Sequence, residues 1–347
     1  MIIPLLCSVI SLQDFLKLRH SLPVVDARSP LEFQQGHIQN AFNIPLLNNE
    51  ERVAVGTDYK QKGQTEAIKT GFRLVGPRLE EIINETEKIS EGKELLVHCW
   101  RGGMRSDNFC KFIGMARIKS QALVGGYKSY RQFALENFKK SFKFILLTGF
   151  TGSGKSDVLR ALKNQGEQIL DLEKLASHKG SAFGGLMMAA QPTTEQFQND
   201  LFEEILKLDL SKRIWVEDES IAIGKIFLPQ DFWNTMCKSH LVQMDVAKEI
   251  RVQRLVNEYG SADRDLFLET IGKITKKLGG QNFNAAREKL MQGDMTSTID
   301  ILLTYYDKAY RNSIEKRKDR ILNSISWNGK NESQLASELI NLKLLNT

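Results

Sequence analysis

The sequence predicts an α/β protein built from two successive domains, each with a parallel sheet covered by helices. Up to about residue 137, short apolar runs alternate with amphipathic helical patterns, which is typical of helices packed on a buried sheet. A basic junction, KKSFK at 139–143, then precedes a new apolar run, FILLTG. The 347 residues are enough to bury two cores. We therefore expect one domain over residues 1–138 and a second over residues 139–347.

The elements of both domains follow from local patterns. In chain order, the pattern of the first domain predicts a strand and a helix in MIIPLLCSVISLQDF, a strand in LPVVDARS, a helix in RLEEIINETEKI and a buried strand in ELLVHC. A helix in RSDNFCKFIGMARI follows, and SQALVGGYKSYRQFALENF supplies a last strand, a glycine turn and a closing helix. The second domain begins with a strand, loop and helix in FILLTGFTGSGKSDVLRAL, and further strands are predicted in RIWVEDES and HLVQMDV. From about residue 246 onward we expect a helical and basic region.

The composition is that of a folded globular protein, with 41% hydrophobic and 26% charged residues. A net charge of +6 suits a polyanionic partner, although a basic protein without such a partner carries the same charge. No C-x-x-C spacing occurs, so we expect neither a zinc site nor a disulfide scaffold, and a cytoplasmic location. The apolar opening lacks a basic n-region, and no run approaches the roughly 20 apolar residues of a membrane span, so we expect no membrane association.

Residues 149–156 match the phosphate-binding pattern G-x-x-x-x-G-K-[ST] between a predicted strand and a predicted helix. The loop consists of Gly149, Phe150, Thr151, Gly152, Ser153, Gly154, Lys155 and Ser156. Its glycines let backbone N–H groups converge on phosphate oxygens, Lys155 adds a positive charge, and Ser156 has a hydroxyl suited to Mg²⁺. The motif predicts a diphosphate site without choosing between ATP, GTP and other diphosphates. Asp218 or Glu219 could hold Mg²⁺ at the next strand end, or either could be a solvated acid.

A second loop follows the predicted strand ELLVHC and contains a cysteine. It consists of Cys99, Trp100, Arg101, Gly102, Gly103, Met104, Arg105 and Ser106. The following helix N-terminus and the two arginines favour the thiolate form of Cys99, and the two glycines let N–H groups turn toward an anion. We therefore predict a reactive nucleophile at Cys99, whereas Cys7, Cys110 and Cys237 lack such a setting and are expected to be structural.

The segment VVDARSPLEFQQGHIQNAFNIP at 24–45, followed by HCWRGGMRS, resembles a rhodanese domain, in which the cysteine carries a persulfide. The loop Cys99-x-x-Gly102-x-x-Arg105 is one residue longer than the usual sulfurtransferase spacing. The order His98-Cys99-x5-Arg105-Ser106 also matches the cysteine-phosphatase signature. The longer loop suits a phosphate-sized group, so plain sulfur transfer is not the only chemistry that the pattern predicts.

The whole chain resembles the tRNA 2-selenouridine synthase family. The resemblance rests on CWRGGMRS, on NNEERVAVGTDYKQKG at 48–63 and on the loop GFTGSGKS, with further matches in LDLEKLASHKGSAFG at 170–184 and VEDESIAIGK at 216–225. It implies a rhodanese-like α/β domain followed by a P-loop NTPase-like parallel α/β domain whose C-terminal part is helical and basic.

This resemblance implies a transferase that acts on wobble 2-thiouridine in the tRNA anticodon loop. The base would be S-geranylated with geranyl diphosphate, and the geranylthio group would then be replaced by selenium from selenophosphate. Both donors would be co-substrates, with no tightly bound cofactor and no protein-bound metal required. The phosphate loop would hold the diphosphate, and Cys99 would receive selenium as an S-selanyl cysteine, with Arg101 and Arg105 at the phosphate end. Contact with a selenophosphate-producing enzyme is a further expectation.

Other substrate contacts are expected from position along the chain. Asp171, His178, Lys179 and Ser181 follow the second strand of the phosphate-loop domain, although a strand end that caps a helix would look the same. The basic side chains after residue 246 are expected to bind tRNA phosphates, and they include Arg251, Arg254, Lys273, Lys276, Lys277 and the run EKRKDR at 315–320.

Two other functions are compatible with these patterns. A cysteine phosphatase or sulfurtransferase fused to an ATP-dependent kinase would turn over ATP with a hydroxyl acceptor. A non-catalytic RNA-binding protein would have no chemical use for Cys99, Arg105 and Lys155, all of which are present.

Overall fold

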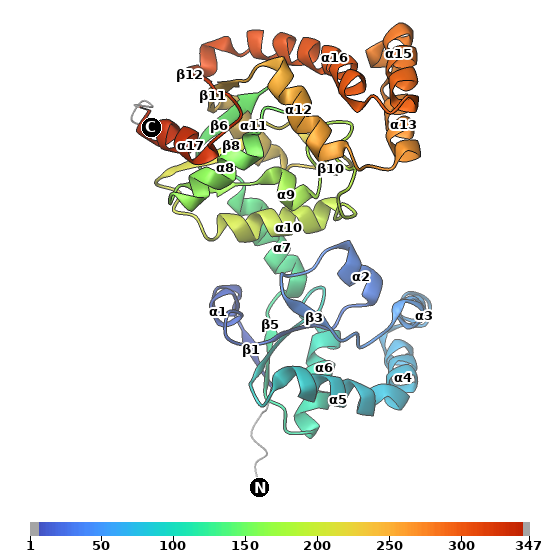
Figure 1. Cartoon of the computed structure of the whole chain (residues 1–347). Helices are drawn as coiled ribbons and strands as arrows, with labels where there is room; N and C mark the ends of the chain where they lie inside the picture. The colour runs from blue at the N-terminus through green and yellow to red at the C-terminus, as the bar shows by residue number, and fades with distance from the viewer. Residues whose placement is uncertain (1–6, 343–347) are drawn as a thin grey trace. The chain divides into compact units, whose positions relative to one another are not determined.

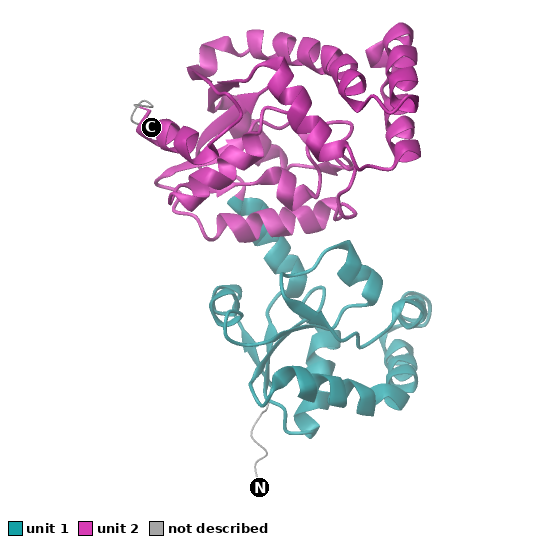
Figure 2. Ribbon diagram, viewed as in Figure 1, with its two compact units in different colours: residues 1–137 teal, residues 138–347 magenta. Residues whose placement is uncertain are grey.

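A computed structural model describes residues 7–342 of the chain, and the expected first strand therefore lies partly outside the described residues. The chain divides between Asn137 and Phe138 into two compact units (Figures 1 and 2), each built on its own parallel sheet. The predicted α/β class is confirmed. No helix in the described range combines the length and apolar character needed to span a bilayer.

The first unit contains a five-stranded parallel sheet in the order β1-β5-β4-β2-β3. Its strands are β1 Cys7–Ile10, β2 Val24–Asp26, β3 Ala41–Asn43, β4 Leu95–His98 and β5 Ser120–Leu123. Asp26 pairs in register with His98, so the ends of β2 and β4 meet at the same sheet edge. This register places the polar end of VVDARS beside the cysteine loop that follows β4. The three-residue strand β3 was not predicted, because its sequence AFN is too short to show an alternation.

Helices cover this sheet and extend beyond it. They are α1 Leu12–Leu18, α2 Pro30–Gln35, α3 Asn49–Lys62, α4 Gln64–Val75, α5 Leu79–Ser90, α6 Met104–Met115 and α7 Gly126–Asn137. Helices α3 and α4 pack side by side as a hairpin (Figure 1) that turns at Gly63, whose φ of +88° favours glycine. The hairpin was not predicted, because α3 has no buried residue and its sequence shows no apolar stripe.

The second unit contains a parallel sheet in the order β12-β11-β6-β8-β7. Its strands are β6 Lys143–Gly149, β7 Gln168–Leu170, β8 Arg213–Glu217, β11 His240–Asp245 and β12 Ile321–Ser326, and a short hairpin adds β9 Ala222–Ile223 and β10 Ile226–Phe227. The region after residue 246 is helical as expected, apart from β12, an edge strand that was not predicted. Only backbone pairing with β11 reveals this strand, since half of its six residues are polar and none is fully buried.

The helices of the second unit form two groups. Close to the sheet lie α8 Lys155–Asn164, α9 Leu172–Ala176, α10 Thr194–Ile205, α11 Gln230–Lys238 and α17 Glu332–Asn341; the others are α12 Lys248–Tyr259, α13 Arg264–Lys273, α14 Thr275–Leu278, α15 Gly280–Met291 and α16 Met295–Glu315. Helices α12 to α16 bury an apolar cluster of their own around Phe267 and Ile271, separate from the core of the sheet around Trp215. The predicted basic region is thus a helical subdomain with a separate core.

Arginine contacts join the helices of this subdomain to one another and connect this part of the chain to the phosphate loop, to α8 and to the end of α11. Arg251 on α12, 3% exposed, makes two hydrogen bonds of 2.8 Å to Asp307 on α16 and donates to the carbonyl oxygen of Thr151 at 3.3 Å. Arg254 pairs with Asp157, and Arg320 donates to the carbonyl oxygens of Ser239 and Met236.

The expectation that all the basic side chains face tRNA is therefore wrong for part of the set. Arg251, Arg254, Arg317 and Arg320 form contacts within the protein. Lys273, Lys276 and Lys277, on α13 and α14, are exposed. The sequence shows the charge of an arginine, but the acid that pairs with it lies far away along the chain.

The Arg251–Asp307 pair predicts a large loss of stability when one partner is removed. Asp307→Ala should lower the free energy of unfolding by about 3 kcal/mol or more, because it leaves a buried guanidinium without its counter-charge. The partly exposed pair Lys248–Asp300 joins the same two helices. Asp300→Ala should therefore cost under about 1 kcal/mol. Urea denaturation of both variants measures the difference, and equal losses would contradict the assigned role of the buried pair.

Candidate active sites

The cysteine loop connects the buried strand β4 to helix α6. Cys99 is 3% exposed, and α6 begins five residues later at Met104. The N–H groups of Tyr127 and Lys128 donate to the carbonyl oxygens of Cys99 and Trp100 at 2.8 and 2.9 Å, so the first turn of α7 fixes the loop. Gly102 has a φ of +60°, and a Cβ there would lie 2.4 Å from the carbonyl oxygen of Leu123. The loop therefore requires glycine at this position.

The thiol of Cys99 is hydrogen-bonded within its own loop. Its Sγ lies 3.3 Å from the hydroxyl Oγ of Ser106, which can give its one hydrogen either to this sulfur or to the carbonyl oxygen of Gly103 at 3.0 Å. Burial raises the pKa of Cys99, but hydrogen bonds from Ser106 and from the loop backbone, together with the charge of Arg105, outweigh burial and lower it below the ordinary value. The geometry thus favours a thiolate.

Arg105 is paired with a carboxylate. Its guanidinium donates to both oxygens of Glu32 on α2, at 2.6 and 3.2 Å. Burial raises the pKa of Glu32, but the hydrogen bond and charge of Arg105 outweigh it and hold the pKa at about 2. A phosphate that binds Arg105 must therefore compete with Glu32, whereas Arg101 is exposed on the loop. The sequence pattern showed both arginines but not that one of them is paired.

Several buried polar side chains lie at the ends of β2 and β4, at the sheet edge where the cysteine loop begins. Arg28 donates to both carboxylate oxygens of Asp26, and its guanidinium lies 3.8 Å from the ring centroid of Tyr127. His98 is also fully buried, and burial lowers its pKa. Asp26 and His98 end the neighbouring strands β2 and β4, so they lie at the sheet edge from which the cysteine loop begins.

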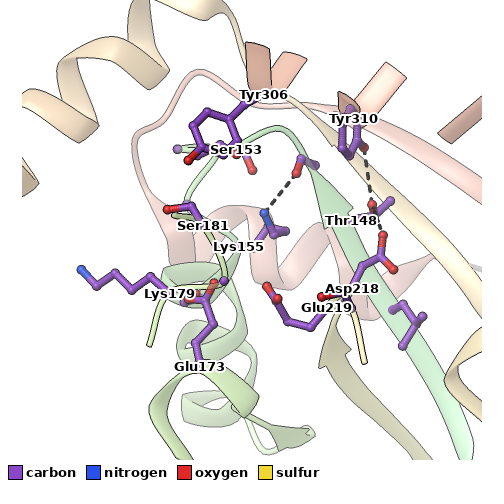
Figure 3. A pocket seen from close by; sticks show the side chains of 18 of the residues that line it. Thr148, Ser153, Lys155, Glu173, Lys179, Ser181, Asp218, Glu219, Tyr306 and Tyr310 are labelled. Carbon is purple, nitrogen blue, oxygen red and sulfur yellow. Dashed lines mark hydrogen bonds between the residues drawn. The ribbon is translucent and has the colours of Figure 1, made fainter. Parts of the chain in front are cut away.

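In the second unit, a cavity of about 740 Å³ opens at the phosphate loop (Figure 3). The loop joins β6 to α8, with Gly152 and Gly154 at φ values of +81° and +77°. A Cβ on Gly154 would meet Arg254 and Trp327 at under 3 Å. Lys155 Nζ donates to the carbonyl oxygen of Gly149 at 3.0 Å. The loop curls around the site where the motif expects phosphate oxygens, and Lys155 lies at its centre.

Asp218 ends a chain of hydrogen bonds at one side of this cavity (Figure 3). The Tyr310 hydroxyl lies 3.4 Å from the Thr148 hydroxyl, which donates to Asp218 at 2.6 Å. Arg317 donates to both oxygens of the same carboxylate at 2.7 and 2.9 Å. Asp218 is thus held by an arginine, a role that the sequence did not indicate because Arg317 lies 99 residues away.

Glu219 lies close to Lys155 and to a second acid. Burial raises its pKa to about 8, with Glu173 adding to the effect and Lys155 opposing it. Glu173 accepts a hydrogen bond of 2.7 Å from the Ser156 hydroxyl. Among the described residues, no three or more His, Cys, Asp or Glu side chains gather in a way that would hold a metal ion.

Some of the residues after β7 that were expected to contact substrate line this cavity. Asp171, Lys179 and Ser181 line the cavity, but His178, 9% exposed, does not. Asp171 also accepts from the N–H of Lys174 at 2.8 Å and caps α9. Lys179 pairs with Glu258 at 2.6 Å.

The cavity also has an apolar wall that the sequence analysis missed. Leu146, Trp233, Met236, Ala309 and Tyr310 line it together with the phosphate loop. They come from β6, α11 and α16, so no local pattern brings them together. The arrangement can therefore bind a molecule with a phosphate group at one end and an apolar body at the other.

Two families match the sequence, one over each part of the chain. Residues 11–133 match the rhodanese-like domain, and residues 142–335 match the tRNA 2-selenouridine synthase AAA domain. The chain is 32% identical to a tRNA 2-selenouridine synthase of Nitrosomonas europaea, over 85% of this chain and 90% of that protein. It is 34% identical to one of Shewanella piezotolerans, over 86% of this chain and 91% of that protein. A solved rhodanese-related protein from Thermoplasma volcanium is 19% identical, covers 36% of this chain and 92% of its own, and gives a TM-score of 0.24.

The contact between Ser106 and Cys99 predicts the acidity of the thiol. Ser106→Ala should raise the pKa of Cys99, because the variant removes a hydrogen bond that stabilises the thiolate, and should slow alkylation at neutral pH by about three- to tenfold. The pH dependence of iodoacetamide labelling, followed on the Cys99 peptide by mass spectrometry, measures this pKa. Arg101→Ala, on the exposed side of the loop, should leave it nearly unchanged. An unaltered pKa in Ser106→Ala would exclude the hydrogen bond as the cause.

The pKa of Glu219 predicts a pH dependence of anion binding in the second unit. Below about pH 8 the carboxyl is protonated and neutral, and above it a negative charge lies beside the phosphate loop. The affinity for inorganic pyrophosphate in metal-free buffer should therefore fall by about three- to tenfold between about pH 7 and about pH 9. Calorimetric titration of Glu219→Gln corrects for titration of the ligand, because this variant stays neutral. Equal pH dependence in both proteins would contradict the prediction.

Proposed function

The chain belongs to the tRNA 2-selenouridine synthase family, and from this premise we propose how its two units share the conversion of 2-thiouridine to 2-selenouridine. The enzyme is a transferase and its substrate is tRNA. We infer that the second unit alkylates the sulfur with geranyl diphosphate and that the first unit then exchanges the geranylthio group for selenium. The observation that carries this division is the shape of the second cavity, which combines a phosphate loop with an apolar wall.

The alkylation step uses the phosphate loop as an anion site. Lys155 and the N–H groups at the start of α8 stabilise the diphosphate as the allylic C–O bond breaks. The sulfur of the base attacks the same carbon, pyrophosphate leaves, and the base loses the proton on its ring nitrogen. Leu146, Trp233 and Met236 lie along the apolar wall, where the geranyl chain would pack away from water. Nucleotide hydrolysis is not needed for this step.

The selenium step uses the thiolate of Cys99. The thiolate would attack the phosphorus of selenophosphate, whose phosphate faces the N-terminus of α6 and Arg101. The P–Se bond breaks, hydrogen selenide is released in the loop, and water then removes the phosphate from Cys99. This selenide attacks C2 of the base, the C–S bond breaks, and geranylthiol is the leaving group. Ser106 supports the thiolate throughout, since its hydroxyl lies 3.3 Å from Sγ.

The phosphate-loop motif also makes Mg²⁺ binding possible, with the Ser156 hydroxyl and Asp218 or Glu219 as candidate ligands. In this structure the Ser156 hydroxyl donates to Glu173, and Asp218 is paired with Arg317. Both groups would have to exchange these partners for a cation, and we derive no step through a metal.

The division of labour predicts opposite defects in two variants. Cys99→Ala should abolish 2-selenouridine but leave geranylated tRNA within about twofold of the wild type, because the phosphate loop is intact. Lys155→Ala should lower geranylation by about a hundredfold, the usual order for loss of a charge that stabilises a leaving group. Mass spectrometry of nucleosides from thiolated tRNA gives both numbers: geranylation is measured with geranyl diphosphate alone, and selenation with both donors.

Two substitutions serve as matched controls. Cys7→Ala removes a thiol of the same unit outside the loop, and Lys163→Ala removes an exposed lysine at the far end of α8. Both should retain both activities. If Cys99→Ala lost geranylation as fully as selenation, the assignment of the two steps to separate loops would be wrong.

A further inference from the structure

A small apolar groove lies beside the cysteine loop in the first unit. It has a volume of about 110 Å³ and is lined by residues of the α3–α4 hairpin and of α6, together with Leu46 and Leu47. We call it the α4 groove; Tyr59, Ile68, Phe72 and Met104 form its rim. Its floor is buried, since Leu46, Leu47 and Val75 are at most 6% exposed. The groove is therefore a depression in an apolar surface.

The large side chains at the rim of the α4 groove are unusually exposed for apolar residues. Tyr59 is 52% exposed, Phe72 58%, Met104 47% and Ile68 39%. Several large apolar side chains exposed around one depression indicate a binding surface, because isolated exposed residues do not line a common cavity. Phe72 is also held in place by an edge-to-face contact with Phe112, at 6.3 Å between ring centroids.

The α4 groove reaches the cysteine loop itself. Met104 and Arg105, which line it, are the first residues of α6, and the next residue, Ser106, contacts Cys99 Sγ. Arg105 brings little net charge to the groove because Glu32 accepts from both ends of its guanidinium. A molecule held here contacts the first turn of α6, which follows the cysteine loop, and faces a mainly apolar lining.

We propose that the α4 groove binds the hydrocarbon chain of the S-geranylated base while the cysteine loop delivers selenium. This inference rests on the proposed function, in which the RNA substrate of this loop carries a branched ten-carbon chain at C2. Most of the lining is apolar, and of its polar side chains Arg105 is already paired with Glu32, so the groove suits an apolar group better than an anion such as selenophosphate or the RNA backbone. The geranyl chain is the one apolar group that the proposed reaction brings to this loop. Its burial would position C2 and retain the leaving geranylthiol away from water.

Gly71 provides a substitution that fills the α4 groove with little risk to the fold. It lies within α4, lines the groove, and a Cβ built on it meets no atom within 4 Å. Gly71→Leu should thus occupy the groove, and it replaces a poor helix former by a good one. Gly56 in α3 also has open space around its Cβ position but lies outside the groove. Gly56→Leu is therefore the matched control.

The test compares two anticodon stem-loop RNAs that differ only in the sulfur substituent, one S-geranyl and one S-methyl. Selenation of each with selenophosphate gives kcat/KM for the wild type and both variants. The wild type should prefer the S-geranyl RNA by at least about tenfold, because several methylene groups leave water. Gly71→Leu should reduce this preference to about twofold or less while selenation of the S-methyl RNA is retained. Gly56→Leu should behave as the wild type, and thermal denaturation should show both variants folded.

The outcomes separate this inference from the proposed function. If the wild type selenates the S-geranyl RNA but Gly71→Leu keeps the full preference, the groove is not the chain site and the proposed function stands. If Gly71→Leu lost kcat/KM equally on both RNAs, the inference would be overturned. The groove would then contact the RNA itself, for example through a base stacked on Phe72. Failure of the wild type to selenate the S-geranyl RNA would overturn the proposed function and this inference with it.

Discussion

Both reactive loops depend on the same constraint, which is that a buried parallel strand must pass its chain to a helix at the sheet edge. The turn leaves the first N–H groups of the helix without partners inside that helix, and they point into the loop. In the first unit this turn presents Cys99 before α6, and in the second it presents the phosphate loop before α8. Gly102 and Gly154 have positive φ values and allow the two loops to curl. One backbone geometry therefore supports both a thiolate at Cys99 and a loop suited to bind phosphate groups.

Two arginines at the loops are paired with acids before any substrate binds, since Arg105 is paired with Glu32 and Arg317 with Asp218. Lys155 instead donates to the carbonyl oxygen of Gly149, and Glu219 beside it is protonated below about pH 8. Anion binding at Arg105 thus replaces an existing ion pair, whereas at Lys155 it meets a positive charge beside a neutral Glu219. These ion pairs reduce the electrostatic repulsion between neighbouring cations. They also favour ligands that have an apolar part, because such ligands gain affinity from the apolar side of each site. In the second unit that side is the wall around Trp233, and in the first we place it at the α4 groove.

The parts of this account that the sequence could predict are those carried by neighbours along the chain. The glycines, Lys155 and Cys99 lie in short motifs between recognisable strands and helices, so the two loops and the α/β class followed directly. The pairing of Arg105 with Glu32 spans 73 residues and that of Arg317 with Asp218 spans 99, and no local pattern encodes either. Strand β12 and helix α3 were missed for a related reason. Neither has an apolar repeat, and each depends on a partner element, β11 or α4, for its place in the fold.

The central claim is that the two units act in sequence through an S-geranylated base. The most direct measurement gives Lys155→Ala two RNAs, one with 2-thiouridine and one already S-geranylated, each with selenophosphate and geranyl diphosphate, and quantifies 2-selenouridine by mass spectrometry. The account predicts that this variant converts the geranylated RNA at close to the wild-type rate and leaves the thiolated RNA almost unselenated. Failure on both RNAs, or conversion of both at the wild-type rate, would contradict it.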